Sequence, residues 1–227
     1  MSSVFNNVHG FYFLHIPKTA GRAVEDVLKQ LNGSLILDVS SEEKKRGIFN
    51  SPFYAEQSYT ELRPIKNILH NKPQNTLHDW MKLYKFCFVR NPYDRAYSAY
   101  KYCMRTAKNK KRQPFGDLTP ENISFREFIR LPKHFNYEIH NHFHITQTEY
   151  MMGYNTDIDY VGKLETIEKD LHYIAEKIGV NFPPLKKKNV TEDIKNKSSM
   201  GNEDKLLIEK LFKADFVNFD YELTSLK

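Results

Sequence analysis

The first strongly patterned stretch of the chain indicates a strand, a tight loop and a helix. Residues 11–16 form an aromatic and branched run of strand length, and Pro17 has no N–H with which to continue a sheet ladder. Apolar residues then recur at helical spacing, and Asn32-Gly33 is a typical C-terminal stop. The pattern therefore predicts a strand over 11–16 and a helix that begins inside the following loop. The apolar stripe of this helix consists of Val24, Val27, Leu28 and Leu31.

A second stretch repeats this design. A strand of buried type over 86–89 ends abruptly at Arg90, a turn containing Pro92 follows, and helical patterning covers 94–104. Such a strand-to-helix turn presents backbone N–H groups at the positive end of a helix dipole, which is a geometry that binds phosphate-like anions. One turn of this kind is more often plain connectivity, but two basic turns favour anion binding.

The remaining pattern completes an α/β fold. Ser124 and Glu127 have the spacing of a capping box, and Gly179 suits the end of a helix. No internal repeat or linker justifies a second domain. We therefore predict a single domain over 1–227 with a central, mainly parallel sheet flanked by helices. Further strands are expected over 34–39, 65–70 and 159–162, and further helices over 76–83, 124–130, 165–178 and 203–214.

His70 is the last residue of one predicted strand. In open α/β sheets the carboxyl ends of the strands line the ligand crevice, so we expect His70 to face the same crevice as Lys18 and Arg90. A side chain that titrates near neutrality suits a general base. His78, on a predicted helix, ranks below it.

Composition favours anionic partners. The 227 residues carry 34 Lys and Arg against 28 Asp and Glu, a formal net charge of +6, which does not distinguish a nucleotide, a sulfated glycan, a nucleic acid or a membrane surface. The first ten residues lack the pattern of a signal peptide, and no run approaches the roughly 18 apolar residues of a membrane span. Cys87 and Cys103 cannot form a disulfide framework. We therefore expect a cytoplasmic protein without a membrane span, and its oligomeric state stays open.

The two turns also carry a family resemblance. His15-Ile-Pro-Lys-Thr-Ala-Gly21 resembles the 5′-phosphosulfate loop of the carbohydrate sulfotransferases, the Golgi-type, heparan sulfate 2-O-sulfotransferase-like enzymes and their bacterial relatives. Phe88-Val-Arg-Asn-Pro-Tyr-Asp-Arg95, with Ser98 and Tyr100, resembles their 3′-phosphate motif. The resemblance implies a P-loop-like sulfotransferase fold that transfers sulfonate from 3′-phosphoadenosine 5′-phosphosulfate (PAPS) to a hydroxyl acceptor. Weaker similarities follow in the family's order over 160–171, 188–191 and 215–221.

The resemblance implies a role for each matching residue. Lys18 would stabilise the charge that develops on the bridging oxygen of PAPS, and His70 would be the general base, although some family members use a carboxylate. Arg90 and Ser98 would bind the 3′-phosphate, and Asn189 would lie over the cofactor. The acceptor would be a carbohydrate, the family's commonest choice. The loop residues that would bind the cofactor are Pro17, Lys18, Thr19, Ala20, Gly21, Arg22 and Ala23.

Four histidines between residues 134 and 144 raise the possibility of zinc. No cysteine or carboxylate lies at ligand spacing nearby, and His140, His142 and His144 would equally suit one face of an extended segment. We therefore expect no metal. In the family this region lies over the acceptor pocket, so the resemblance makes His142, His144 and Gln147 candidate substrate contacts.

Two other functions fit part of the pattern. A P-loop nucleotide kinase or NTPase needs Gly-Lys-[Ser/Thr] and a Mg²⁺ ligand, whereas here Lys18 precedes Gly21. A non-enzymatic module could bind glycan or nucleic acid through the basic segments 108–112 and 186–188. We rank both below sulfonate transfer and expect no nucleic-acid partner.

One residue of the cofactor loop departs from the family pattern. Arg22 stands where the family usually has Thr or Ser, so it either contacts the 5′-phosphate or points away from it.

Overall fold

The fold was obtained as a computed structural model, which describes residues 2–38, 82–107, 123–133, 135, 139–152, 157–185 and 200–224. The chain divides into two compact units. Unit 1 comprises residues 1–89 and 149–188, and unit 2 comprises residues 90–148 and 189–227. Each unit is described by itself.

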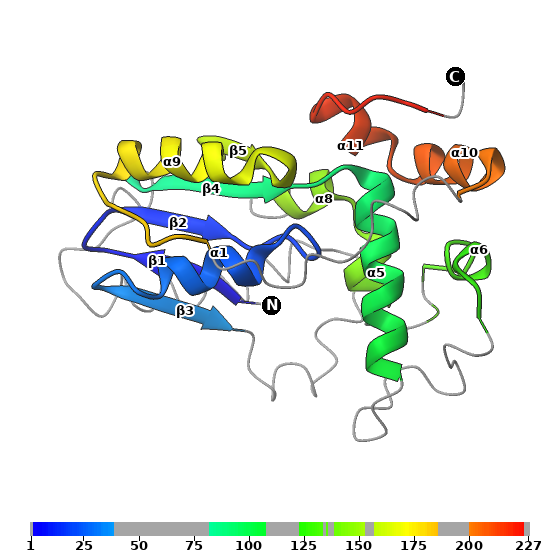
Figure 1. The fold of residues 1–227 in the computed structure, drawn as a ribbon, viewed down its shortest axis with the longest axis horizontal. Helices are drawn as coiled ribbons and strands as arrows, with labels where there is room; N and C mark the ends of the chain where they lie inside the picture. Colours follow the sequence, from blue (N-terminus) through cyan, green and yellow to red (C-terminus); the bar gives the residue numbers. More distant parts are fainter. Residues whose placement is uncertain are drawn as a thin grey trace. The chain divides into compact units, whose positions relative to one another are not determined.

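Unit 1 is built on a mixed sheet (Figure 1). Among the described residues its strands are β1 (Ser2–Asn6), β2 (Phe11–Leu14), β3 (Ser34–Asp38), β4 (Tyr84–Val89) and β5 (Tyr160–Lys163), in the order β3-β1-β2-β4-β5. The pairs β2–β4 and β4–β5 are parallel, whereas β1 pairs antiparallel with both β2 and β3. The three parallel strands therefore end at the same edge of the sheet.

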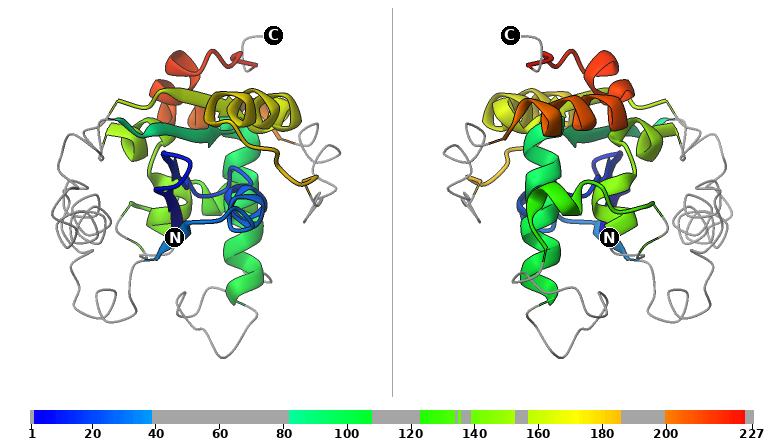
Figure 2. Two further views of the ribbon diagram at one scale, coloured as in Figure 1. Left: turned by 90° about the vertical axis from the view of Figure 1, so that its left-hand side faces the viewer. Right: turned by 90° about the vertical axis from the view of Figure 1, so that its right-hand side faces the viewer.

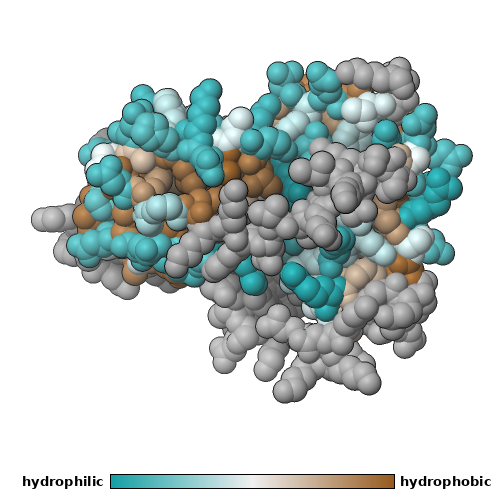
Figure 3. All heavy atoms as spheres, viewed as in Figure 1, coloured by the Kyte–Doolittle hydropathy of each residue, from teal (hydrophilic) through white to brown (hydrophobic). Residues whose placement is uncertain are grey.

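Two helices cover one face of this sheet. Helix α1 (Gly21–Leu28) contributes Val24 and Leu28 to a buried cluster with the aromatic side chains of β2 and β4, and α9 (Ile167–Ile178) contributes Leu171 and Ile174. The short η3 (Leu164–Thr166) precedes α9. Phe182, in the segment after α9, packs against the same cluster, and apolar atoms are visible between α9 and α1 in Figure 3. Helical stripes and strand runs predicted from the sequence thus form the core of unit 1.

Unit 2 is helical. Its longest helix, α5 (Pro92–Ala107), packs against η2 (His140–His144), α6 (Phe125–Phe128) and α10 (Asn202–Leu211) (Figure 2). Helix α11 (Lys213–Asn218) follows α10, and α8 (Gln147–Met152) begins in unit 2 and ends in unit 1. The core between these helices is aromatic, with Phe128, Phe143, Phe212 and Phe216 among its buried members.

The predicted α/β class is confirmed, and several local details differ from the predictions. Strand β1 was not predicted; it is held in a hairpin in which the buried Asn6 side chain accepts hydrogen bonds from the N–H groups of Val8 and His9. The predicted last helix breaks at Phe212 into α10 and α11. The expected strand over 65–70 and most of the helix over 76–83 lie outside the described residues. No helix in the described part of the chain has the length and apolar character needed to cross a membrane.

Candidate active site

The loop between β2 and α1 has an unusual backbone. Lys18 and Ala20 adopt left-handed conformations, with φ of 71° and 63°, and Thr19 between them is not left-handed. Thr19 is buried, and its hydroxyl donates a hydrogen bond of 2.9 Å to the Ile16 carbonyl. Left-handed non-glycine residues cost about 1–3 kcal/mol each and cluster at functional sites. Where left-handed residues alternate with residues that are not left-handed, successive backbone N–H groups point toward one side, as they do in anion-binding nests.

The N-terminus of α1 is open to an anionic ligand. Ala20 is the N-cap residue, no side chain caps the helix, and its first turn holds no acidic residue. The Ala20 carbonyl accepts hydrogen bonds from the N–H groups of Ala23 and Val24, so the N–H groups of Gly21 and Arg22 precede the first intrahelical bond. This terminus therefore suits a phosphate group chemically. The Arg22 side chain is exposed. Whether it contacts the 5′-phosphate or points away from it stays a prediction.

His15 has a role that the sequence analysis missed. A Cβ atom built on Gly21 would lie only 1.9 Å from Cδ2 of His15, so the imidazole packs directly on the glycine. The ring also stacks on Phe13 at a centroid distance of 6.1 Å, and its Nδ1 lies 3.9 Å from a carboxylate oxygen of the buried Glu25. His15 therefore connects the end of β2 to the first two turns of α1. The sequence signal for this contact is the presence of His15 and Gly21 at the two ends of one short motif.

The turn after β4 begins helix α5 in a way that the sequence encodes locally. Asn91 caps the helix, because its side-chain oxygen accepts a hydrogen bond of 3.1 Å from the Tyr93 N–H. Pro92 takes the first helical position, where its missing N–H costs nothing. Arg90 is therefore the single residue between the last residue of the strand and the helix cap.

Gln147 is fully buried, and its side-chain amide bonds to the backbone of Arg90. Both residues lie in unit 2. The carboxylate of Asp215 holds Gln147 in turn. The predicted contact between Gln147 and substrate stays a prediction, since the described contacts of this amide are to Arg90 and Asp215.

The other predicted site residues are placed as follows. Ser98 is half-buried on α5, in the same unit as Arg90, whereas Lys18 belongs to unit 1. β2 and β4 are neighbouring parallel strands, so the Lys18 loop and the chain that leads to Arg90 leave the sheet from the same edge. His70, Asn189 and the basic segments 108–112 and 186–188 lie outside the described residues.

The histidine-rich stretch forms a π-helical turn over His140–His144 and not the extended segment that its alternating histidines would also suit. His142 packs on Tyr102 at a centroid distance of 4.3 Å, and the buried His144 packs on Phe143 at 4.8 Å. Within the described ranges, no group of three or more His, Cys, Asp and Glu side chains could hold a metal ion. The substrate contacts proposed for His142 and His144 stay predictions.

Stability should depend on pH through His144. Burial, followed by the nearby His140 and Lys133, lowers the pKa of His144 from 6.5 to about 4. As pH falls below 6.5, the His144 imidazole binds a proton in the unfolded chain but not in the folded chain. Up to about 3 kcal/mol of the free energy of unfolding is therefore lost by pH 4. We expect urea midpoints that fall between pH 7 and 4, and a shallower fall in His144→Leu. His172→Asn, at an exposed position on α9, is the control, and an unchanged slope in His144→Leu would contradict the assignment.

Comparisons with known proteins identify the family to which this sequence is similar. A sequence model of the sulfotransferase family matches residues 2–222. Carbohydrate sulfotransferase 11 of Mus musculus is 25% identical over 97% of this chain and 67% of its own length. Carbohydrate sulfotransferase 14 of Danio rerio is 25% identical over 78% of this chain and 49% of its own length. An uncharacterised protein of Archaeoglobus fulgidus is 32% identical over 42% of this chain and 67% of its own length.

No solved structure matches the chain. The family match nevertheless extends across both units, from β1 to the residues beyond α11. It includes both strand-to-helix turns, the one with Lys18 before α1 and the one with Arg90 after β4. The chain therefore belongs to the sulfotransferase family of PAPS-dependent enzymes.

Proposed function

We propose that the chain transfers a sulfonate group from PAPS to a hydroxyl group of a carbohydrate. The observation that carries this proposal is the β2–α1 loop, in which Lys18 sits in a left-handed conformation before an uncapped helix N-terminus. The names of the relatives, carbohydrate sulfotransferases 11 and 14, support a glycan acceptor. Because one family match spans both units, we also propose that residues 1–227 form a single sulfotransferase domain.

The chemistry asked of each residue follows from charge. PAPS supplies the sulfonate, and adenosine 3′,5′-bisphosphate leaves with negative charge on the former bridging oxygen of its 5′-phosphate. The Lys18 ammonium stabilises this charge, while the N–H groups at the start of α1 hold the 5′-phosphate. Arg90 binds the 3′-phosphate with Ser98, since a guanidinium offers paired donors to phosphate. Asn189 completes this set.

The acceptor hydroxyl needs a base because its own pKa lies far above neutrality. We propose His70 for this task, with His78 or a carboxylate as the alternatives. His142, His144 and Gln147 are proposed to lie near the acceptor. Lys18 and the loop N–H groups are expected to supply the charge stabilisation without a metal ion.

The test is sulfonate transfer in a chelator. The protein is incubated with PAPS and a library of glycans and small alcohols, with and without EDTA, and the acceptors are examined by mass spectrometry. We expect the mass of one sulfonate group on a glycan, to an equal extent in both conditions. A requirement for Mg²⁺ with transfer of phosphate from ATP would instead support a kinase, and a protein inert toward every acceptor would contradict the proposal.

A further inference from the structure

The backbone of Arg90 is held on both sides by one buried side chain. Oε1 of Gln147 accepts a hydrogen bond of 2.7 Å from the Arg90 N–H, and Nε2 of Gln147 donates one of 2.9 Å to the Arg90 carbonyl. Arg90 lies between the last residue of β4 and the cap of α5, outside both regular elements. The amide of Gln147 supplies hydrogen-bond partners to its N–H and to its carbonyl there. The two bonds orient the peptide groups on either side of the Arg90 Cα atom, and these groups determine the direction of its Cα–Cβ bond.

Asp215 holds this amide in the required orientation. Its buried carboxylate accepts hydrogen bonds from the N–H of Gln147 (2.9 Å) and from Nε2 of Gln147 (3.3 Å) through one oxygen. The other oxygen accepts from the N–H (2.8 Å) and the hydroxyl (2.9 Å) of Thr148. The NH₂ group thus faces two acceptors, the Asp215 carboxylate and the Arg90 carbonyl, which leaves Oε1 facing the Arg90 N–H. A glutamate at position 147 could not supply these donors.

Helix α11 fixes Asp215 against the start of α5. The next residue, Phe216, packs its ring on that of Tyr93 at a centroid distance of 5.0 Å. Tyr93 lies in the first turn of α5, directly after the Asn91 cap. The segment 215–221, which has only a weak similarity to the family, therefore packs beside the turn that carries Arg90.

We propose that Gln147 and Asp215 are positioning residues that hold Arg90 toward the 3′-phosphate of the sulfonate donor. This inference rests on the proposed function, because it assumes that Arg90 binds that phosphate. Hydrogen bonds to a buried charged group hold the bonded residues rigidly when every donor and acceptor in the network has a partner. The clamp, defined as Gln147 with Asp215, thus determines affinity for the 3′-phosphate and leaves the sulfonate chemistry to the Lys18 loop.

The experiment compares two ligands that differ by the 3′-phosphate alone, adenosine 3′,5′-bisphosphate and AMP, by isothermal titration calorimetry. The ratio of their affinities measures what the 3′-phosphate contributes. In Gln147→Met, which keeps the side-chain volume but loses the amide, we expect this ratio to fall about tenfold, since a charge-assisted contact is displaced. The KM for PAPS, measured at saturating acceptor, should rise as well. An unchanged ratio in the folded variant would overturn the clamp.

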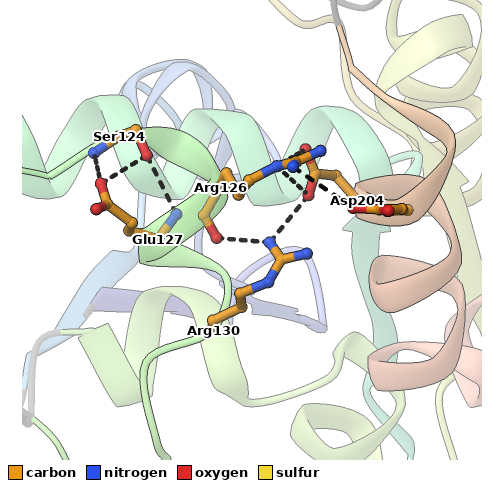
Figure 4. A network of polar contacts seen from close by, with 6 residues as sticks. Ser124, Arg126, Glu127, Arg130 and Asp204 are labelled. Atoms are coloured by element: carbon orange, nitrogen blue, oxygen red, sulfur yellow. Dashed lines mark hydrogen bonds and ion pairs between the residues drawn. The ribbon is translucent and has the colours of Figure 1, made fainter.

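Asp204 offers a matched control in the same unit (Figure 4). Its carboxylate is also buried and accepts hydrogen bonds from Arg130 at 2.9 Å and from Arg126 at 3.3 Å, which join α10 to α6 and to the residue two positions after it. Asp204→Asn should lower the melting temperature and leave the affinity ratio unchanged. A fall in the ratio in this control would show that general loosening of unit 2 is responsible, and would overturn the clamp.

Two further variants separate the possible failures. If Gln147→Met does not fold, Thr148→Val removes the hydroxyl that donates to Asp215 and accepts from Asn218, while the backbone bond from Thr148 to Asp215 remains; we expect the ratio to fall about threefold, and no change would overturn the clamp. Arg90→Ala tests the underlying assumption. If this variant keeps the wild-type ratio, the 3′-phosphate role of Arg90 fails, and the clamp fails with it. If the ratio falls in Arg90→Ala but not in the Gln147 and Thr148 variants, the clamp alone fails.

Discussion

Replacement of Lys18 by alanine is expected to lower kcat by about 10²–10³-fold, the usual effect of removing a preorganised group that stabilises developing charge. The KM for PAPS should change much less, because the charge on the leaving oxygen appears in the transition state. Steady-state kinetics with saturating acceptor measures both constants. Lys169→Ala, which removes the same charge from an exposed position on α9, is the control and should be fully active.

Lys18→Gly excludes loss of folding as the explanation. The left-handed backbone at residue 18 is strained for lysine and relaxed for glycine. We therefore expect this variant to melt at the wild-type temperature or a few degrees above it, and to be as inactive as the alanine variant. Activity within tenfold of wild type in either variant would contradict the role of Lys18.

The second large effect is expected at Gly21. Its Cβ in Gly21→Ala would lie 1.9 Å from Cδ2 of His15, so either the imidazole or the first turn of α1 must move. Overpacking of this kind costs about 1–3 kcal/mol of stability. A shift of about 1 Å in the loop that carries Lys18 can lower activity by about 10²-fold. Thermal melting and kcat measure the two effects.

A double-mutant cycle with His15→Ala tests the cause. Removal of the imidazole relieves the clash, so the double variant should melt above Gly21→Ala. His15→Ala alone should lose activity, because it removes the packing that connects β2 with α1. Additive losses of stability in the double variant would show that His15 and Gly21 are not coupled.

Local features of the fold were predictable because their causes lie within a few residues of each other. The capping box of Ser124 and Glu127 is present, with the Ser124 N–H donating to Glu127 at 2.7 Å. Gly179 ends α9 in a left-handed conformation. Pro92 takes the first position of α5, as its chemistry requires. In each case one side chain determines the backbone next to it.

The features that were missed depend on partners distant in sequence. β1 has little apolar pattern of its own and is a strand because β2 and β3 pair with its backbone. The histidines of 140–144 alternate as in a strand, but they form a π-helical turn packed against α5, because burial of Phe143 in the core of unit 2 outweighs the local pattern.

The sequence by itself determined the α/β class, the two basic strand-to-helix turns and the family, because these depend on periodicity, caps and short motifs. Only the tertiary structure decided how Arg90 is held. Gln147 is 57 residues from Arg90, and Asp215 is 68 residues beyond Gln147. No local propensity relates residues so far apart; their contact exists because packing of α5, α8 and α11 buries polar groups that must then find partners. The same reason places His15 on Gly21, where the absence of a side chain acquires its meaning only from the ring that lies against it.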